Sequence, residues 1–285
     1  MTATADFTVM GVVNVTPDSF SDGGLYADAA AAISHALQLE AEGAQILDVG
    51  GESTRPGAEP VDAEAELRRV LPVIEALHER GVSAQISVDT SKASVAAAAL
   101  DAGATLVNDV TALRGDPAMA GLVAARGVQC CLMHMLGEPR TMQDDPHYGD
   151  VVSDVKAFLE ERMAFAVARG VAEDNILLDP GIGFGKTPEH NLELLARVDE
   201  LVALGPPVVI GTSRKSFLGR ITGRPVDDRL AATIATNVLA YERGARVFRV
   251  HDVAPVRDAL VIAGATVRRR WPTTPTTNTT RTLTT

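Results

Sequence analysis

The unit that recurs through this chain is plainest in Ile176-Leu-Leu-Asp-Pro-Gly-Ile-Gly-Phe-Gly-Lys-Thr187. A short apolar run, expected as a buried strand, ends on the carboxylate of Asp179, and three glycines let the next loop approach a ligand or another backbone closely. Thr187 and Pro188 are a good N-cap and first-turn pair, so a helix is expected from residue 188. Taken alone, the stretch fits a capped turn as well as it fits a binding site.

The glycines match neither of two common phosphate-binding patterns. A nucleotide-triphosphate loop needs a glycine five residues before Gly185, and Pro180 stands there. The dinucleotide fingerprint needs a glycine three residues after Gly183, and Lys186 stands there. The loop is therefore a glycine-rich turn or site of another kind.

The order of strand, loop and helix recurs from end to end. Apolar runs predict strands at residues 9–13, 46–49, 84–88, 105–107, 128–133, 176–178, 208–210 and 245–248. Helical patterns follow at residues 28–43, 67–81, 91–102, 116–125, 150–168, 188–204, 211–219, 226–241 and 253–267. Pro72 lies inside the second helical pattern, where we expect a kink or a later start.

Eight such units predict a (β/α)8 TIM barrel, an α/β fold with a parallel eight-stranded barrel and outer helices. The chain has 285 residues, and barrels of this size form one domain. We expect a single catalytic domain at residues 1–267 and a disordered Thr/Pro-rich tail at residues 268–285. An open doubly wound sheet, which uses the same alternation with fewer units, is the alternative fold.

Composition and charge limit the classes of partner. Hydrophobic residues make up 46% of the chain and charged residues 22%, as in a globular protein with a large core. The net charge of −11 argues against non-specific binding to nucleic acid or an anionic membrane, because both need a basic surface. With no membrane-length apolar run and no secretory signal, a cytoplasmic location is expected. Cys130 and Cys131 should point to opposite faces of a strand as core thiols.

The carboxyl ends of the expected strands are nearly all polar, and in a barrel of this kind the active site lies at those ends. Isolated Asp and Asn residues there are often helix caps, but a set from separate strands is better explained as a site. The set consists of Asn14, Asp48 with Glu52, Asp89, Asn108, Met133 with His134, Asp179, Lys215, and Arg249 with His251.

The residue types divide this expected site by chemistry. Asp179, Asn108 and Asp89 suit a flat heterocycle with several N–H donors, since a carboxylate can accept from two adjacent donors. The cations and hydroxyls of the last two loops suit phosphate, which this fold commonly holds there. No His, Cys and carboxylate cluster has the spacing of structural zinc, whereas magnesium would leave only a faint trace such as Asn14.

Several motifs can now be compared with a known family. They are Gly11-Val-Val-Asn-Val-Thr-Pro-Asp-Ser-Phe-Ser-Asp-Gly23, Asp48-Val-Gly-Gly-Glu-Ser-Thr-Arg-Pro-Gly57, Ser87-Val-Asp-Thr90, Asn108-Asp-Val110, Leu132-Met-His134, the loop from Asp179, Gly211-Thr-Ser-Arg-Lys-Ser216 and Arg249-Val-His251. Together they resemble the dihydropteroate synthase family. The resemblance covers about residues 9–267 and includes every strand end in order.

The resemblance implies an enzyme of folate synthesis that joins 6-hydroxymethyl-7,8-dihydropterin diphosphate to 4-aminobenzoate, with Mg2+ as cofactor. It also implies a homodimer formed through the last helices. By resemblance the pterin would contact Asp89, Asn108, Val110, Met133, Asp179 and Lys215. The diphosphate would contact Ser53, Arg55, Arg249 and His251. The aminobenzoate would contact Thr54, Pro56, Phe184, Lys215 and Ser216, and Asn14 would ligate magnesium.

The residues that we expect to act in catalysis are Asp89, Lys215, Arg249 and Asp22. Diphosphate leaves readily once magnesium, Arg249 and His251 neutralise its growing charge. The dihydropterin can donate electrons to the methylene group, so we expect a dissociative path through a cation that Asp89 and Asp22 stabilise. The aromatic amine is neutral at pH 7 and needs no strong base.

Two other functions fit parts of this pattern. A methyltransferase that passes a methyl group from a reduced folate to a corrinoid uses a similar barrel, but the cationic and hydroxyl loops here favour diphosphate chemistry. A non-catalytic pterin-binding paralogue would be expected to have lost Asn14, Arg55, Lys215 or Arg249, and all four are present.

Overall fold

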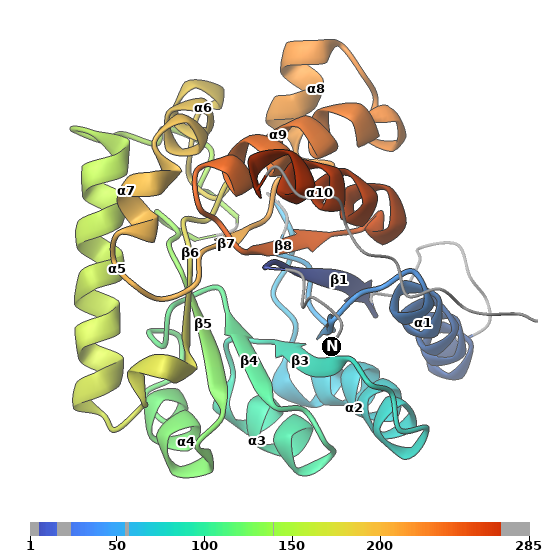
Figure 1. Ribbon diagram of the computed structural model, residues 1–285. Helices are drawn as coiled ribbons and strands as arrows, with labels where there is room; N and C mark the ends of the chain where they lie inside the picture. Colours follow the sequence, from blue (N-terminus) through green and yellow to red (C-terminus); the bar gives the residue numbers. More distant parts are fainter. Residues whose placement is uncertain (1–5, 16–23, 55–56, 139, 269–285) are drawn as a thin grey trace, which may run out of the picture.

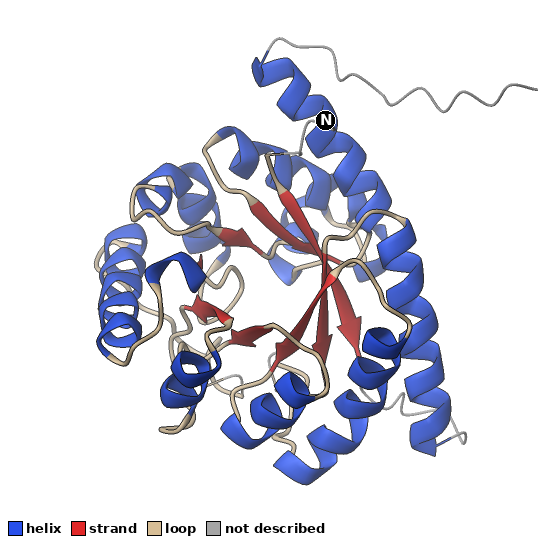
Figure 2. Ribbon diagram, turned by 60° about the horizontal axis from the view of Figure 1, so that its bottom comes forward, coloured by secondary structure: helices blue, strands red, loops and turns tan. Residues whose placement is uncertain are grey.

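Eight parallel strands form a ring at the centre of the molecule (Figure 2). The structure is a computed structural model that describes residues 6–15, 24–54, 57–138 and 140–268. The strands are β1 (Thr8–Asn14), β2 (Ile46–Gly50), β3 (Gln85–Asp89), β4 (Leu106–Asp109), β5 (Gln129–Met133), β6 (Ile176–Asp179), β7 (Val209–Ile210) and β8 (Val247–Val250).

The pairing order closes these strands into a barrel. The order is β6-β5-β4-β3-β2-β1-β8-β7, and a bridge between Leu178 and Val208 joins β6 to the segment that leads into β7. Every strand therefore lies beside its neighbours in the chain, and β1 also pairs with β8. This order confirms the (β/α)8 barrel. The doubly wound alternative is wrong, because an open sheet would leave two unpaired edges.

Helices cover the outside of the ring (Figures 1 and 2). They are α1 (Gly24–Ala41), α2 (Ala63–Glu79), α3 (Ala93–Asp101), α4 (Met119–Arg126), α5 (Val151–Ala168), α6 (Pro188–Ala196), α7 (Val198–Val202), α8 (Ser216–Thr222), α9 (Leu230–Glu242) and α10 (Val253–Arg268), with short 3-10 turns η1 (Glu173–Asn175) and η2 (Val226–Asp228). α10 ends at Arg268, the first residue of the expected tail, and residues 269–285 lie outside the described residues.

Alternation along the strands separates two apolar layers. One layer fills the inside of the barrel and consists of Met10, Ile46, Leu106, Cys131, Leu177, Val209 and Val247. The other, much larger layer lies between the strands and the helices and includes Cys130. The two thiols are buried, unpaired and on opposite faces of β5, as the sequence predicts.

The local predictions around helix starts are partly right. Thr187 caps α6 by accepting a hydrogen bond from the His190 amide at 3.2 Å, and Pro188 opens the helix, as expected. α2 begins at Ala63 and continues through Pro72, so the later start considered for it is wrong. Pro72 lies on the exposed face of α2, where the missing N–H and its former partner can be compensated by water.

Two other helices differ from the expected ranges. The 188–204 pattern divides into α6 and α7 because Arg197 leaves the helical region, with φ of −119° and ψ of 29°. The helix expected from residue 211 begins only at Ser216, since Arg214 has a φ of +59° and Lys215 is extended. The loop that precedes α8 is therefore free to present side chains to the barrel mouth.

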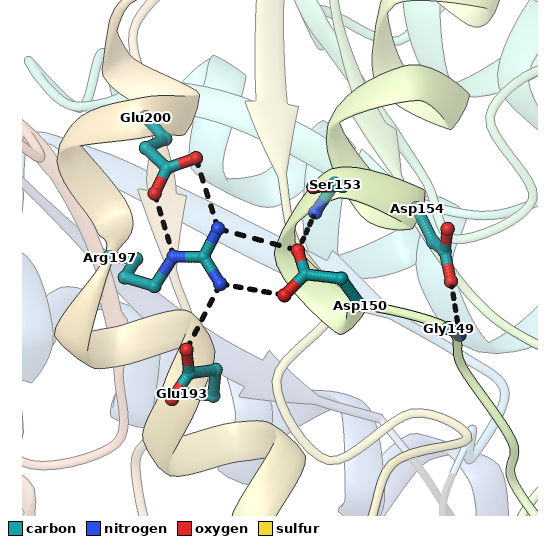
Figure 3. Close-up of polar contacts among 7 residues, drawn as sticks. All are labelled: Gly149, Asp150, Ser153, Asp154, Glu193, Arg197 and Glu200. Carbon is teal, nitrogen blue, oxygen red and sulfur yellow. Dashed lines mark hydrogen bonds and ion pairs between the residues drawn. The ribbon is translucent and has the colours of Figure 1, made fainter.

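The break at Arg197 is the centre of an ionic network that fastens α5 to α6 and α7 (Figure 3). The guanidinium lies 2.8 Å from Asp150, 3.0 Å from Glu193 and 2.7 Å from Glu200. Asp150 also caps α5 by accepting from the Ser153 amide, and these bonds hold its pKa below the ordinary value. A surface network of this kind ties neighbouring outer helices together. Within the described residues, no helix is long and apolar enough to cross a membrane.

Candidate active site

A buried polar network joins the carboxyl ends of β2, β3, β4 and β8 inside the barrel. Arg249 donates from Nε to Oδ2 of Asp48 and from Nη2 to Oδ2 of Asp89, both at 2.6 Å. Asp48 also accepts from Ser87 Oγ at 2.6 Å and from Asn108 Nδ2 at 3.0 Å. Side chains two residues apart on a strand share a face, so these groups continue the inward-facing rows of the barrel. The structure thus brings together four of the strand-end residues that the sequence places in the site, Asp48, Asp89, Asn108 and Arg249, and adds Ser87.

The network sets two carboxylates beside one guanidinium. Asp48 is fully buried and Asp89 is 11% exposed. Burial, opposed by Arg249 and reinforced by the charge of Asp48, raises the pKa of Asp89 to about 7. Burial disfavours the charge of Arg249, but the two carboxylates outweigh it and raise its pKa above the ordinary value. Arg249 therefore stays charged, while Asp89 can change protonation near neutral pH.

Asp179 and the glycine loop form another side of the mouth. Asp179 is buried, and its Oδ1 accepts from the Gly181 amide at 2.6 Å. Burial raises the pKa of Asp179 although Lys215 and Arg249 act to lower it. Gly181 has a φ of +66°, and a Cβ there would overlap the carbonyl oxygen of His134. Glycine is required because this loop lies backbone against backbone on the end of β5.

Phe184 belongs to an apolar cluster at the mouth that also contains Val110 and Met133. The Nζ atom of Lys215 lies 4.0 Å from the centroid of the Phe184 ring, which is a cation–π contact. Lys215 stands at the N-cap of α8, directly after the loop of β7. Residues predicted for the pterin and for the aminobenzoate therefore meet in one place.

The loop before α8 is held to the end of β8. Ser213 Oγ lies 3.0 Å from Nδ1 of His251 and accepts from its amide at 3.2 Å. Arg214 pairs with Asp252 at 2.7 Å. Ser216 is exposed at the start of α8 and lines a cavity of about 240 Å³ between α8 and the glycine loop. These contacts place His251 and Ser216 on the same side of the barrel as Arg249 and Lys215.

The loop after β2 carries Ser53 and Thr54, both half-buried. Lys92 Nζ lies 2.6 Å from Glu52 and 2.6 Å from Glu66, and the side chain of Glu66 has no exposure. The Lys92 bridge therefore clamps the base of this loop to α2 and α3.

Asn14 ends β1 with an exposed side chain beside Gly50, its partner on β2. Its amide oxygen is a ligand type that magnesium accepts, and an exposed position leaves room for water and substrate oxygens. In the part of the chain that the structure describes, no group of three or more His, Cys, Asp or Glu could hold a metal ion. The remaining predicted residues, Asp22, Arg55 and Pro56, lie outside the described residues.

Sequence reasoning assigned no role to two buried charged residues, Asp48 and Lys186. Asp48 was visible as a strand end, and its inward position two residues after Ile46 could have indicated its place in the network. Lys186 is 2% exposed, with Nζ 2.9 Å from Nδ1 of His134 and 3.0 Å from the carbonyl oxygen of Phe184. The buried orientation of the Lys186 side chain depends on how the glycine loop folds, and no pattern in the sequence predicts it.

Comparison with known proteins points in one direction. The family model described as pterin binding enzyme matches residues 10–251. The dihydropteroate synthase of Mycobacterium leprae is 48% identical over 268 residues, covering 92% of this chain and 94% of that protein. Because these relatives are dihydropteroate synthases, they favour a synthase function over that of a corrinoid methyltransferase.

Solved structures agree with the sequence match. Xanthomonas albilineans dihydropteroate synthase with 4-aminobenzoic acid is 49% identical, with a TM-score of 0.85 over 91% of this chain and 93% of that chain. The same organism's enzyme in complex with 7,8-dihydropteroate is 46% identical, with a TM-score of 0.82 over 91% and 93%. The chain therefore belongs to the pterin-binding enzyme family, among its dihydropteroate synthases, which are transferases.

Proposed function

We propose that this chain transfers the pterin-methyl group of 6-hydroxymethyl-7,8-dihydropterin diphosphate to the amino group of 4-aminobenzoate, forming 7,8-dihydropteroate and diphosphate. One observation carries the proposal: acceptors for a heterocycle, at Asp89 and Asp179, share the barrel mouth with cations for a leaving anion, at Arg249 and Lys215. The relatives solved with 4-aminobenzoic acid and with 7,8-dihydropteroate support the same substrate and product.

The pterin would bind with its N–H edge on Asp179. This carboxylate is buried, and a buried carboxylate that receives two adjacent N–H donors recovers the free energy lost by desolvation. Asn108 donates to Asp48, which orients its carbonyl oxygen as a further acceptor for the ring. Val110 and Met133 would cover the flat face of the heterocycle, since both belong to the apolar cluster at the mouth.

The diphosphate would bind to Arg249, His251, Ser53 and Arg55. Arg249 is 24% exposed and already charged, so it can turn part of its guanidinium toward an entering anion. Asn14 would hold a magnesium ion together with water and the diphosphate oxygens. When bound, magnesium would supply positive charge that makes diphosphate a better leaving group.

The aminobenzoate would lie against Phe184 and Lys215, with its carboxylate at Ser216 and with Thr54 and Pro56 on the far side. The aromatic ring of Phe184 suits stacking on a second aromatic ring. Lys215 presents an ammonium to the carboxylate end or to the ring, since it stands at the N-cap of α8. This arrangement keeps the neutral amino group directed toward the pterin methylene.

In the reaction, the bond between the methylene carbon and the diphosphate oxygen breaks first, and its electron pair leaves with diphosphate. The ring electrons of the dihydropterin delocalise the resulting positive charge, which the carboxylates of Asp89 and Asp22 would stabilise. The amine lone pair then forms the new carbon–nitrogen bond, and the nitrogen releases one proton. No strong general base is required, because the attacking amine is already neutral.

The test follows diphosphate release by purified protein supplied with both substrates and Mg2+. Release should require aminobenzoate, and 7,8-dihydropteroate should accumulate in equal amount. Diphosphate release without aminobenzoate would mean hydrolysis, and no release at all would favour the non-catalytic paralogue. A leaving-group isotope effect showing that the new bond forms as the old one breaks would rule out the dissociative path.

We further propose a homodimer that buries the outer surface of α9 and α10. Leu239 is 45% exposed, Ile262 66% and Val267 57%, which leaves apolar side chains of neighbouring helices in contact with water. The substitution Ile262→Asp should shift the sedimentation coefficient from dimer to monomer. Lys156→Asp on the outer helix α5 is the matched control, and an unchanged dimer in Ile262→Asp would place the interface elsewhere. The cytoplasmic location stays a prediction.

A further inference from the structure

The ammonium of Lys186 is enclosed between two segments that meet at the barrel mouth. It lies 2.9 Å from Nδ1 of His134, which follows β5, and donates to the carbonyl oxygen of Phe184 at 3.0 Å. Lys186 is 2% exposed and His134 is 6% exposed. The bond to Phe184 closes a small ring around Gly185, whose φ is +60°, so it sets the direction in which the backbone at Phe184 faces.

Phe184, whose carbonyl oxygen accepts from Lys186, also contacts Lys215 through its ring. The Nζ atom of Lys215 is 4.0 Å from the centroid of the Phe184 ring. A chain of contacts therefore runs from His134 through Lys186 and Phe184 to Lys215. The last two residues are those assigned above to the aminobenzoate, whereas that assignment includes neither Lys186 nor His134.

We infer that Lys186 is a positioning residue of the aminobenzoate site, which bridges His134 and the Phe184 carbonyl and so fixes the Phe184 ring against Lys215. This inference rests on the proposed assignment of Phe184 and Lys215. It adds a role for a buried charged residue that the proposed substrate contacts leave out.

The state of His134 fits a hydrogen-bond acceptor. Burial, helped by the charges of Lys186 and Arg114, lowers the pKa of His134 to about 2, so the ring is neutral and Nδ1 can accept from the amine. The ring also packs against Phe158 in a T-shaped contact, with centroids 4.8 Å apart. His134 is thus a fixed anchor for the amine.

The groups around Lys186 act in opposite directions on its pKa. Burial lowers its pKa to about 7, the Lys215 ammonium adds to this effect, and Asp179 opposes it. Tyr148 is a further titratable neighbour, with its ring centroid 6.0 Å from Nζ. A ligand that placed N–H donors on Asp179 would reduce the support that Asp179 gives to the ammonium. The pKa of Lys186 should therefore depend on whether the pterin site is filled.

Steady-state kinetics of Lys186→Met test the inference. Met is similar in length and volume to Lys but has no hydrogen-bond donor. The Phe184 carbonyl oxygen therefore loses its bond to residue 186 while the packing is kept. We expect the KM for aminobenzoate to rise about tenfold, with kcat and the KM for the pterin diphosphate changed by less than about threefold. Equal losses in both KM values, or no change in the aminobenzoate KM, would overturn the inference.

Tyr148→Phe is the matched control. The Tyr148 hydroxyl donates to the carbonyl oxygen of Gly185 at 2.7 Å, so its removal loosens the same loop without touching the Phe184 carbonyl. Both variants should lower the melting temperature, but only Lys186→Met should raise the aminobenzoate KM. A similar rise in Tyr148→Phe would mean that loop stability alone matters, and the specific role of Lys186 would be lost.

Phe184→Ala separates this inference from the site assignment on which it rests. If Phe184→Ala leaves the aminobenzoate KM unchanged, the assigned site itself is wrong. If Phe184→Ala raises that KM and Lys186→Met does not, only the role of Lys186 is wrong. Should Lys186→Met fail to fold, His134→Leu removes the other end of the bridge and should produce the same selective rise, and its failure to do so would overturn the inference.

Nuclear magnetic resonance offers a direct readout, because the chain has only four lysines, Lys92, Lys156, Lys186 and Lys215. With 13C at the lysine ε-methylene groups, the signal missing from Lys186→Met should titrate near pH 7 in the wild-type protein. Adding the pterin diphosphate should move this midpoint downward. A midpoint near the ordinary lysine value would show that the ammonium is not enclosed by His134 and Phe184, and would contradict the inference.

Discussion

Nε of Arg249 lies 2.6 Å from Oδ2 of Asp48, although the two residues are 201 positions apart in the chain. The second nitrogen used by the guanidinium, Nη2, is equally close to Asp89. The cation that we assign to the leaving diphosphate is thus shared between two carboxylates before substrate enters. An entering diphosphate must compete with them, and the carboxylates in turn keep the guanidinium oriented at the mouth.

The first prediction compares Asp179→Ala with Arg249→Ala. Asp179→Ala removes the acceptor for the pterin N–H edge and should abolish binding of a pterin that lacks diphosphate, measured by calorimetry. Arg249→Ala should weaken binding of inorganic diphosphate while the pterin alone still binds. Unchanged pterin affinity in Asp179→Ala would refute the proposed orientation of the ring.

The second prediction concerns pH. Since burial raises the pKa of Asp89 to about 7, this residue is protonated below that pH and is a carboxylate above it. If the carboxylate stabilises the cationic transition state, kcat/KM for the pterin diphosphate should fall as pH decreases through about 7. The fall should approach tenfold per pH unit below the pKa. Asp89→Asn should be slow at every pH, and an acid limb that survives in this variant would assign the titration to another group.

The third prediction concerns the Lys92 clamp. Lys92→Met leaves Glu66, which is fully buried, without its ion-pair partner, and also frees Glu52 at the base of the loop after β2. Loss of one partner of a buried pair should lower the free energy of unfolding by about 2–4 kcal/mol, measured in urea. Arg68→Ala on α2, the helix that also carries Glu66, removes the exposed pair with Glu64 and should cost no more than about 0.5 kcal/mol. Equal effects would show that burial of Glu66 is unimportant.

The fourth prediction uses two glycines with the same φ of +66°, Gly181 and Gly81. A Cβ at Gly81 would meet nothing within 4 Å, so Gly81→Ala should cost only the left-handed backbone penalty of about 1 kcal/mol. A Cβ at Gly181 would overlap the His134 carbonyl. Gly181→Ala should therefore cost at least about 3 kcal/mol and displace Asp179, with loss of pterin binding. If both variants unfold at the same urea concentration, the close packing of the loop on β5 is not as described.

Much of the fold was predictable because local patterns specify it. Each strand is a short apolar run that both layers of the barrel cover, and each helix begins where the pattern changes, as at Thr187. The errors lie where one residue overrides a pattern. Arg197 interrupts a continuous helical pattern because its backbone is not helical. Its side chain forms an ion pair with Asp150, which holds α5 against α6 and α7. Arg214 and Lys215 delay α8 in the same way.

By itself, the sequence determined the barrel, the polar strand ends and the residue types available for pterin and diphosphate, because alternation and strand position decide which side chains face the mouth. Only the tertiary structure decided which of these groups pair. Asp48 lies at the centre of a network because β1 pairs with both β2 and β8 in the closed barrel, which brings Asp48 on β2 close to Arg249 on β8. Lys186 became a buried bridge when the glycine loop folded onto His134. Pairing depends on distance and desolvation, which are properties of the folded chain and leave no mark in the order of its residues.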